Sequence, residues 1–353
     1  MLAKLLADLP RGDDWIFEPK WDGFRALVFR DGDDLLIQSR DEKPLDRYFP
    51  ELALPLKTQL PPRCVLDGEL VIARANALDF EALQLRLHPA ASRVKKLAAE
   101  LPASVVFWDV LCLDDRSLLE TPFRERRALL ESILAGAAPP IYVTPATGDR
   151  DLASDWFRRF EGAGLDGVMA KPPRGTYEPN KRVMIKVKHE RECDCVVAGF
   201  RWHKDSASTA VGSLLLGLFD DDGALQHVGV SASFTAQKRR ELVDFLAPYG
   251  ESALASHPWA QWAGVAGHAA GDRAEPQRMP GGKSRWSQGK DLSWEPLRPE
   301  LVVQVAYDHM QGSRFRHTAQ FRRWRTDKSP RDCTYAQLEV VAPHELAAIF
   351  SPA

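Results

Sequence analysis

The chain has 353 residues, of which 44% are apolar and 27% charged, and its formal net charge at pH 7 is −2. This length predicts two domains, and the composition is typical of globular proteins with packed cores rather than of disordered chains. No run of about 18 apolar residues occurs, which argues against a membrane-spanning helix, and the near-neutral charge argues against nucleic-acid binding through overall charge alone.

The N-terminal segment, Met1–Trp15, contains only a short apolar stretch and no small-residue cleavage site. We therefore interpret it as a helix that leads into the first domain, not as a secretory signal. A cytoplasmic protein without membrane attachment is expected.

Strands and helices are both predicted in the first half of the chain. The turn-forming string Asp31-Gly32-Asp33-Asp34 predicts a hairpin. Thr121 and Pro122 are predicted to begin one helix, with Thr121 as its N-cap, and Gly162 and Gly164 to end another. The predicted strands are Phe24–Arg30, Leu35–Ser39, Val65–Ile72, Val105–Leu113, Gly167–Lys171 and Val183–Lys188, and the predicted helices are Phe123–Leu134 and Leu152–Glu161.

The pattern changes after Lys188, where short strands predominate. The predicted strands are Cys195–Arg201, Leu214–Phe219, Gln226–Val230, Leu301–Tyr307 and Tyr335–Val341, with one helix at Thr235–Leu246. Five strands and one helix predict a small barrel, and the OB-fold is the leading candidate. Residues 252–299, rich in Ala, Gly, Pro, Trp and Arg, are predicted to form a long inserted loop with some helix at its start.

Five cysteines are present, and two of them, Cys193 and Cys195, form a CxC string. No second Cys or His pair follows at the spacing of a zinc site. We therefore expect reduced thiols packed in strands rather than a metal centre.

A basic strip runs from Gln311 to Arg331 and contains a single acid, Asp327. Clustered cations on a near-neutral protein suit phosphate recognition, although a solvent-exposed charged face accounts for the strip equally well. Its basic residues are Arg314, Arg316, Arg322, Arg323, Arg325, Lys328 and Arg331.

The string Glu18-Pro19-Lys20-Trp21-Asp22-Gly23-Phe24-Arg25 contains the most informative lysine. A lysine can attack phosphorus only as a free amine, so a catalytic Lys20 needs surroundings that lower its pKa or remove its proton. Gly23 allows close backbone approach, and Arg25 can bind a ribose or phosphate oxygen. A single KxDG string is a weak signal, because a surface loop can contain it by chance.

Further polar strings interrupt or end the predicted strands. A polar triplet with glycine inside a buried strand is unfavourable unless it faces a ligand, and Asp67-Gly68-Glu69 is such a triplet. Lys186 and Lys188 alternate with apolar residues, so they share one strand face, as binding of a polyphosphate would require. The remaining strings are Ser39-Arg40, Phe107-Trp108-Asp109 and Asp166-Gly167-Val168-Met169-Ala170-Lys171.

In this order and spacing, the strings resemble the motifs of the covalent nucleotidyltransferase superfamily, which contains DNA ligases, RNA ligases and mRNA capping enzymes. The resemblance extends over nearly the whole chain and is strongest to small bacterial ATP-dependent DNA ligases, the ligase C type and the ligase module of ligase D. The matching strings are Lys20–Arg25 (motif I), Ser39-Arg40 (motif Ia), Asp67–Glu69 (motif III), Trp108-Asp109 (motif IIIa), Asp166–Lys171 (motif IV), Lys186–Lys188 (motif V) and Arg325-Thr326-Asp327-Lys328 (motif VI).

The resemblance implies a two-domain α+β protein. Residues 1–190 would form a nucleotidyltransferase (adenylation) domain with antiparallel sheets and helices. Residues 191–353 would form an OB-fold barrel that contains the insertion at 252–299. A hinge after Lys188 would allow the barrel to rotate, and with Lys20 so near the N-terminus no DNA-binding domain is expected before it.

The resemblance also implies a role for each matching residue. Lys20 would take AMP from ATP, and Mg²⁺ or Mn²⁺ would be held by Glu69 and Asp166. The other implied roles are adenine selection by Glu18, ribose binding by Arg25 and Glu69, adenine stacking by Trp108, binding of the α-phosphate by Lys186 and Lys188, orientation of pyrophosphate by Arg325, Asp327 and Lys328, and DNA binding by Arg40, Arg314, Arg316, Arg322 and Arg323.

The implied activity is ATP-dependent sealing of 3′-hydroxyl/5′-phosphate nicks in duplex DNA, through lysyl-AMP and adenylylated DNA. A monomer is expected, with repair polymerases as partners, and replication, repair and recombination all remain open as sources of nicks. Three alternatives are an RNA ligase, a capping guanylyltransferase and a non-catalytic OB-fold nucleic-acid binder.

Two positions depart from the family pattern. Motif IV usually begins with glutamate where this chain has Asp166, although a hard divalent cation accepts either carboxylate. The adenine-stacking residue is usually phenylalanine, and this chain has Trp108 with Phe107 beside it. Either ring can stack, so the sequence leaves that choice open.

Overall fold

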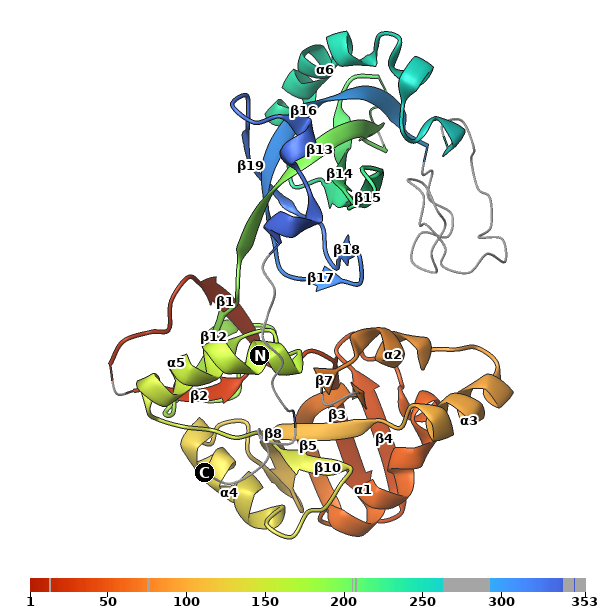
Figure 1. Cartoon of the computed structure of the whole chain (residues 1–353). Helices are drawn as coiled ribbons and strands as arrows, with labels where there is room; N and C mark the ends of the chain where they lie inside the picture. Colours follow the sequence, from red (N-terminus) through yellow and green to blue (C-terminus); the bar gives the residue numbers. More distant parts are fainter. Residues whose placement is uncertain are drawn as a thin grey trace. The chain divides into compact units, whose positions relative to one another are not determined.

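The computed structural model describes residues 1–12, 14–74, 77–204, 206, 208–262, 293–338 and 346. The chain divides into two compact units (Figure 1). The first comprises Met1–His189, and the second comprises the described residues from Glu190 to Leu338. Leu346 belongs to the first unit, where it packs in a hydrophobic cluster. Each unit has its own buried core.

Two sheets organise the first unit. The larger has the order β10-β8-β5-β3-β4, with β9 beside β8, and the smaller has the order β1-β12-β11-β2. Pairing is antiparallel except between β1 and β12 and between β10 and β8. The strands are β1 (Leu2–Leu6), β2 (Ile16–Pro19), β3 (Phe24–Asp31), β4 (Asp34–Ser39), β5 (Arg63–Val71), β8 (Ser104–Leu113), β9 (Arg116–Ser117), β10 (Ile141–Val143), β11 (Val168–Lys171) and β12 (Arg182–Val187), with a small hairpin of β6 (Ala73–Arg74) and β7 (Ala77–Leu78).

Helices α1 (Ala53–Gln59), α4 (Phe123–Ile133) and α5 (Arg150–Arg159) pack against these sheets through apolar side chains. Leu130 of α4 and Leu56 of α1 are fully buried in the core of the larger sheet. Asp149 caps α5 by accepting hydrogen bonds from the amides of Asp151 and Leu152. The helices are η1 (Asp46–Tyr48), η2 (Pro50–Leu52), α1 (Ala53–Gln59), α2 (Phe80–Leu85), α3 (Ala91–Glu100), α4 (Phe123–Ile133), α5 (Arg150–Arg159) and η3 (Phe160–Ala163).

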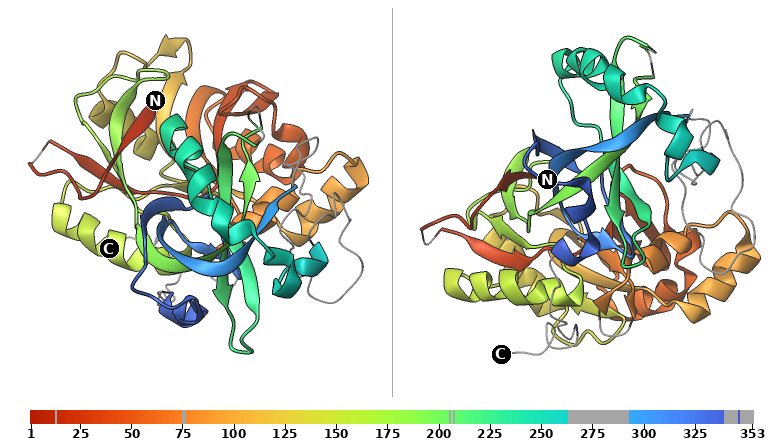
Figure 2. Two further views of the ribbon diagram at one scale, coloured as in Figure 1. Left: turned by 90° about the horizontal axis from the view of Figure 1, so that it is seen from above. Right: turned by 45° about the horizontal axis from the view of Figure 1, so that its top comes forward.

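The second unit is a curved five-stranded antiparallel sheet, β15-β14-β13-β16-β19, with α6 packed against β14 and β16 (Figure 2). Its two edges meet at an isolated bridge between Ser231 and Ala319, which gives the partly open barrel of an OB-fold. The predicted fold class is thereby confirmed. The elements are β13 (Arg191–Trp202), β14 (Val211–Phe219), β15 (Leu225–Ser231), α6 (Ala236–Gly250), η4 (Ala253–Ser256), η5 (Ala260–Trp262), β16 (Glu295–Tyr307), β17 (Met310–Gln311), β18 (Arg314–Phe315), β19 (Gln320–Trp324), η7 (Pro330–Asp332) and η8 (Tyr335–Gln337).

Three local predictions were wrong. The N-terminal segment contains a strand, β1, rather than a helix, because residues 2–6 pair in parallel with β12. Thr121 does not cap α4; the N-cap position is Pro122, which makes no side-chain cap. Tyr335–Gln337 is a 3-10 helix, not a strand, and residues 339–341 of that predicted strand lie outside the described residues.

The predicted loop at 252–299 was only partly right. It begins with η4 and η5, as expected of a helical start, but Glu295–Pro299 already belongs to β16. Residues 263–292 of that prediction lie outside the described residues. Within the described part of the chain, no helix is long and apolar enough to cross a membrane.

Candidate active site

Lys20 lies just after β2, beside the turn that precedes β11. Its amide donates to the carbonyl of Gly167 at 2.8 Å, and its carbonyl accepts from the amide of Asp166 at 2.9 Å. Its Nζ lies 2.6 Å from Oδ2 of Asp166, and Nζ of Lys188 lies 2.6 Å from the same oxygen. Two candidate phosphate-binding lysines therefore share one carboxylate.

The turn at Gly167 makes this arrangement possible. Gly167 has φ of +131°, and a Cβ there would lie 2.0 Å from the carbonyl oxygen of Val187. Only glycine fits, so β11 can approach the end of β12, which precedes Lys188. Burial opposes ionisation of Asp166, but the ammonium groups of Lys20 and Lys188 outweigh it and hold the pKa of Asp166 below its ordinary value.

Arg25 and Asp67 form a bidentate ion pair across β3 and β5. Nη2 and Nε of Arg25 donate to the two carboxylate oxygens of Asp67 at 2.6 and 3.0 Å, and Nη1 donates to the carbonyl of Met1 at 2.7 Å. Tyr177 completes the group, because its hydroxyl donates to Asp67 at 3.1 Å and accepts from Arg25 at 3.0 Å. The guanidinium is held in one orientation by three partners.

Glu69 lies opposite Arg25 in the β3–β5 register, two residues beyond Asp67. Its Oε1 accepts from the amide of Gly23 at 3.2 Å. Burial raises the pKa of the Glu69 carboxyl to about 7, against the lowering influence of Lys20 and Arg25. Glu69 is thus a titratable group close to both predicted nucleotide-binding cations.

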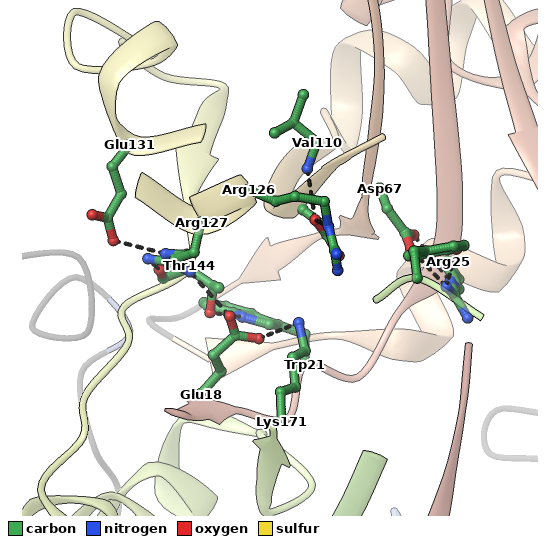
Figure 3. Close-up of polar contacts among 12 residues, drawn as sticks. Glu18, Trp21, Arg25, Asp67, Val110, Arg126, Arg127, Glu131, Thr144 and Lys171 are labelled. Carbon is green, nitrogen blue, oxygen red and sulfur yellow. Dashed lines mark hydrogen bonds and ion pairs between the residues drawn. The ribbon is translucent and has the colours of Figure 1, made fainter. Parts of the chain in front are cut away.

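Glu18 is buried between two cations, as Figure 3 shows. Its Oε2 lies 2.6 Å from Nζ of Lys171, and its Oε1 accepts from Nη1 of Arg127 at 3.1 Å. Arg127 also binds Glu131 and the carbonyl of Thr144. These contacts fix the end of β2 immediately before Lys20.

Phe107 and Trp108 point to opposite faces of β8. Phe107 is fully buried in the core of the larger sheet, whereas Trp108 is half-buried and packs beside the cluster that contains Phe17 and Trp21. Nζ of Lys171 lies 5.6 Å from the centre of the Trp108 ring. Of the two aromatic residues, only Trp108 has a ring that is partly accessible.

Two further predicted residues lie on neighbouring strand ends. Lys186 is half-buried on β12, with Met169 of β11 as its partner in the antiparallel register. Arg40 is exposed in the turn directly after β4. The first unit therefore brings Lys20, Asp166 and Lys188 into contact, and it also joins Arg25, Asp67 and Tyr177. Glu69 interacts electrostatically with both Lys20 and Arg25. Among the contacts described, none joins Arg40 to these residues.

Arg325, Asp327 and Lys328 form an ion-pair cluster within the second unit. Arg325 makes two 2.9 Å hydrogen bonds to Asp327, which lower the pKa of Asp327 to about 2. Nη1 of Arg325 also lies 2.9 Å from Oδ2 of Asp194, and Nζ of Lys328 lies 2.9 Å from the same oxygen. Asp194 was not predicted as a site residue.

The predicted DNA-binding arginines differ in their surroundings. Arg322 and Arg323 are exposed on β19, where Arg322 pairs with Glu190 and Arg323 donates to Gln304 at 2.7 Å. Arg314 donates instead to Nδ1 of the buried His227 at 2.8 Å. Arg316 is half-buried beside His309, and burial lowers the pKa of Arg316 to about 10.

A divalent cation is compatible with the carboxylates of the first unit. Among the described residues, no three His, Cys, Asp or Glu side chains form a preformed metal cluster. Mg²⁺ commonly binds through one or two carboxylates, with water and substrate phosphates as its remaining ligands. The partly buried, ionised carboxylate of Asp166 fits that kind of site.

Comparisons with known proteins agree with this geometry. Residues 1–188 match the "ATP dependent DNA ligase domain" and residues 207–328 match the "ATP dependent DNA ligase C terminal region". The chain belongs to the ATP-dependent DNA ligase family. These matches favour a DNA ligase over the RNA ligase, the capping enzyme and the non-catalytic binder.

Individual DNA ligases are also similar to this chain in sequence or in fold. The chain is 55% identical to DNA ligase C2 of Mycolicibacterium smegmatis, over 96% of this chain and 93% of that protein. It is 31% identical to the multifunctional non-homologous end joining DNA repair protein LigD of Mycobacterium tuberculosis, over 67% of this chain and 30% of that protein. A solved structure from a study of Lig E DNA ligases has a TM-score of 0.53 at 17% identity, covering 92% of this chain and all of that one, which shows a shared fold.

Sequence reasoning missed several residues that contact the predicted site residues. Asp194 could have been suspected, because it is a single charge within the apolar run of β13. Tyr177 and Arg127 gave no comparable signal, since a lone tyrosine in a loop and an arginine in a helix are common. Their contacts depend on chain segments far apart in sequence.

Proposed function

We propose that this ligase seals 3′-hydroxyl/5′-phosphate nicks in duplex DNA through a covalent AMP on Lys20. The observation that carries the proposal is the contact of Lys20 and Lys188 with one carboxylate oxygen of Asp166. Asp166, an anionic group suited to a divalent cation, then contacts both the proposed nucleophile and a proposed phosphate-binding lysine.

In the first step, the Nζ of Lys20 attacks the α-phosphorus of ATP. The N–P bond forms, the P–O bond to pyrophosphate breaks, and the proton of the ammonium must leave Nζ before attack. The Nζ of Lys20 contacts Asp166, so this interaction has to weaken before Nζ can approach phosphorus. A divalent cation bound at Asp166, with Glu69 nearby, would supply positive charge that neutralises the phosphate oxygens.

The remaining groups of the first unit would hold the nucleotide. Trp108 is proposed to stack on adenine, because Phe107 has no accessible face. Arg25, oriented by Asp67 and Tyr177, is proposed to bind the ribose together with Glu69. Lys186 and Lys188 would bind the α-phosphate, and Glu18 would contribute to adenine selection through the rigid end of β2.

The later steps transfer AMP to the 5′-phosphate of the nick and then displace it with the 3′-hydroxyl. Arg40, Arg322 and Arg323 are exposed cations suited to the DNA backbone. Arg325, Asp327 and Lys328 are proposed to orient pyrophosphate in the first step, which requires the two units to approach each other. We further propose a cytoplasmic monomer that works with repair polymerases on the bacterial DNA.

The test is covalent labelling with α-labelled ATP and Mg²⁺ or Mn²⁺, followed by denaturing electrophoresis. Wild-type enzyme freed of bound AMP should retain label, Lys20→Ala should retain none, and Lys95→Ala, which changes an exposed lysine of α3, should label normally. Label that persists in Lys20→Ala would overturn the assignment of the nucleophile. Labelling with GTP instead of ATP would favour capping chemistry.

A further inference from the structure

The second unit contains a carboxylate that the family motifs do not include. Asp194 lies on β13, within a run of buried apolar residues, and only 10% of its side chain is exposed. Both cations of the Arg325–Lys328 motif contact its Oδ2 at 2.9 Å. A buried charge is unfavourable unless it is paired, so the two cations and Asp194 stabilise one another.

The backbone of Asp194 is fixed on both sides. On one side β13 pairs with β16, where Gln304 is the partner of Asp194. On the other side, the side-chain amide of Gln337 hydrogen-bonds the backbone of Asp194. Its Oε1 accepts from the Asp194 amide at 2.8 Å, and its Nε2 donates to the Asp194 carbonyl at 3.0 Å. The carboxylate therefore has little freedom to follow the cations if they move.

The cations keep donors that Asp194 does not use. Lys328 has three N–H donors, and one contact to Asp194 is described. Arg325 lies between Asp194 and Asp327, with 19% of its side chain exposed, and the Lys328 side chain is 22% exposed. Lys328 can therefore bind a phosphate oxygen while Asp194 still holds it. The Nε and Nη2 of Arg325 donate to Asp327, so Arg325 would exchange Asp327 for phosphate while Asp194 holds its Nη1.

We propose that Asp194 is a positioning residue for the nucleotide step, which holds Arg325 and Lys328 together as a preformed pyrophosphate-binding pair. This inference rests on the proposed function. Without the carboxylate, two like charges would repel each other, and each long side chain would have to be ordered again whenever pyrophosphate binds. Sealing of a nick that already has AMP on its 5′-phosphate releases no pyrophosphate and should not depend on this pair.

The test compares Asp194→Asn, Asp194→Glu and wild type in three reactions. The first is lysine adenylation from ATP, the second is its reversal, in which pyrophosphate takes AMP from Lys20 and re-forms ATP, and the third is sealing of a pre-adenylated nick. Glu300→Gln, which changes an exposed carboxylate of β16 paired with Arg298, serves as the matched control.

Asp194→Asn should slow adenylation and raise the pyrophosphate concentration needed for reversal by about tenfold or more, an effect of the size expected for loss of preorganised charge. Sealing of the pre-adenylated nick should stay within about twofold of wild type. Asp194→Glu, which restores the charge, should recover part of the loss, and Glu300→Gln should behave as wild type in all three reactions.

Two results would overturn the inference. One is adenylation and reversal at wild-type rates in Asp194→Asn, and the other is an equal loss in all three reactions, which would indicate a purely structural role. Asp194→Glu keeps the test decisive if Asp194→Asn does not fold. A wild-type enzyme without any lysine label would instead refute the proposed function, so the two failures are distinguishable.

Discussion

The Nζ of Lys20 lies 2.6 Å from Oδ2 of Asp166, in an ion pair between residues 146 positions apart. As the proposed nucleophile, Lys20 has to leave this contact before it attacks phosphorus, and a group that competes for the carboxylate favours that step. Lys188 competes already, because its Nζ contacts the same oxygen. A divalent cation at Asp166 would compete more strongly, and this would link metal binding to activation of Lys20.

The first prediction concerns Asp166. Replacement with Asn removes the charge and should slow lysine adenylation by roughly 100-fold or more, the usual effect of losing an electrostatic group at a reacting phosphate. Asp166→Glu, which has the acid usual in the family, should stay within about tenfold of wild type because a hard cation accepts either carboxylate. Single-turnover rates of lysine adenylation, measured across a Mg²⁺ titration, test both variants. If the Mg²⁺ dependence of Asp166→Asn equals that of wild type, Asp166 is not a metal ligand.

The second prediction separates the two neighbouring aromatic residues. Trp108→Ala should raise the KM for ATP by about 5- to 100-fold, since stacking of a base on an aromatic ring contributes about 1–3 kcal/mol. Phe107→Leu changes a fully buried ring and should lower the melting temperature while leaving the KM nearly unchanged. Initial rates at varied ATP and thermal unfolding of both variants make the comparison, and the reverse pattern would assign stacking to Phe107.

The third prediction concerns pH and Glu69. Burial raises the pKa of this carboxyl from 4.5 to about 7, so between these values the folded protein binds a proton that the unfolded chain has released. Glu69 therefore contributes stability below about pH 4.5 that is lost as pH rises through 7, with a total on the order of 3 kcal/mol.

Urea unfolding of the nucleotide-free protein at pH 5 and pH 8 measures this contribution. Wild type should lose more stability over that interval than Glu69→Gln, in which the group no longer titrates. Identical pH dependence in the two proteins would show that the Glu69 carboxyl is not perturbed. Because both proteins share every other ionisable group, their difference isolates Glu69.

The fourth prediction divides the basic strip of the second unit. The double variant Arg322→Ala/Arg323→Ala removes exposed cations, so it should weaken nicked-DNA binding and reduce the slope of log K against log salt by about 1 to 2. Arg314→Ala should mainly reduce stability, by about 1–3 kcal/mol, because it leaves the buried His227 without its donor. Fluorescence anisotropy at several salt concentrations and thermal unfolding distinguish them, and a lower salt slope in Arg314→Ala would place that residue on the DNA.

Much of the candidate site follows from short strings. Lys20, Asp166, Lys188 and Glu69 stand in motifs whose residue types follow from phosphoryl-transfer chemistry, and the order of those motifs specified the family. The strand that contains Glu69 was also predictable, because β5 is an apolar run with mostly buried side chains. The strand β2, which ends immediately before Lys20, was not predicted. The OB-fold was predictable because several short strands with one helix follow Lys188, which is the element pattern of a small barrel.

The N-terminal strand shows where local patterns fail. The residues of β1 suit a helix by intrinsic preference, and their strand conformation depends on hydrogen bonds to β12, about 180 residues later in the chain. The choice between Phe107 and Trp108 was likewise open, because adjacent residues of a strand point to opposite faces and the sequence does not say which face is the core.

By itself, the sequence determined the family, an ATP-dependent DNA ligase, and the residues proposed as the lysine nucleophile, the phosphate-binding lysines and the acidic groups around them. Only the tertiary structure decided which charges meet. Lys20 and Asp166 are 146 residues apart, and Asp194 and Lys328 are 134 apart, yet each pair is in direct contact. Ion pairs of this kind depend on strand register and on the close approach that a glycine such as Gly167 permits, and neither is encoded in a local pattern.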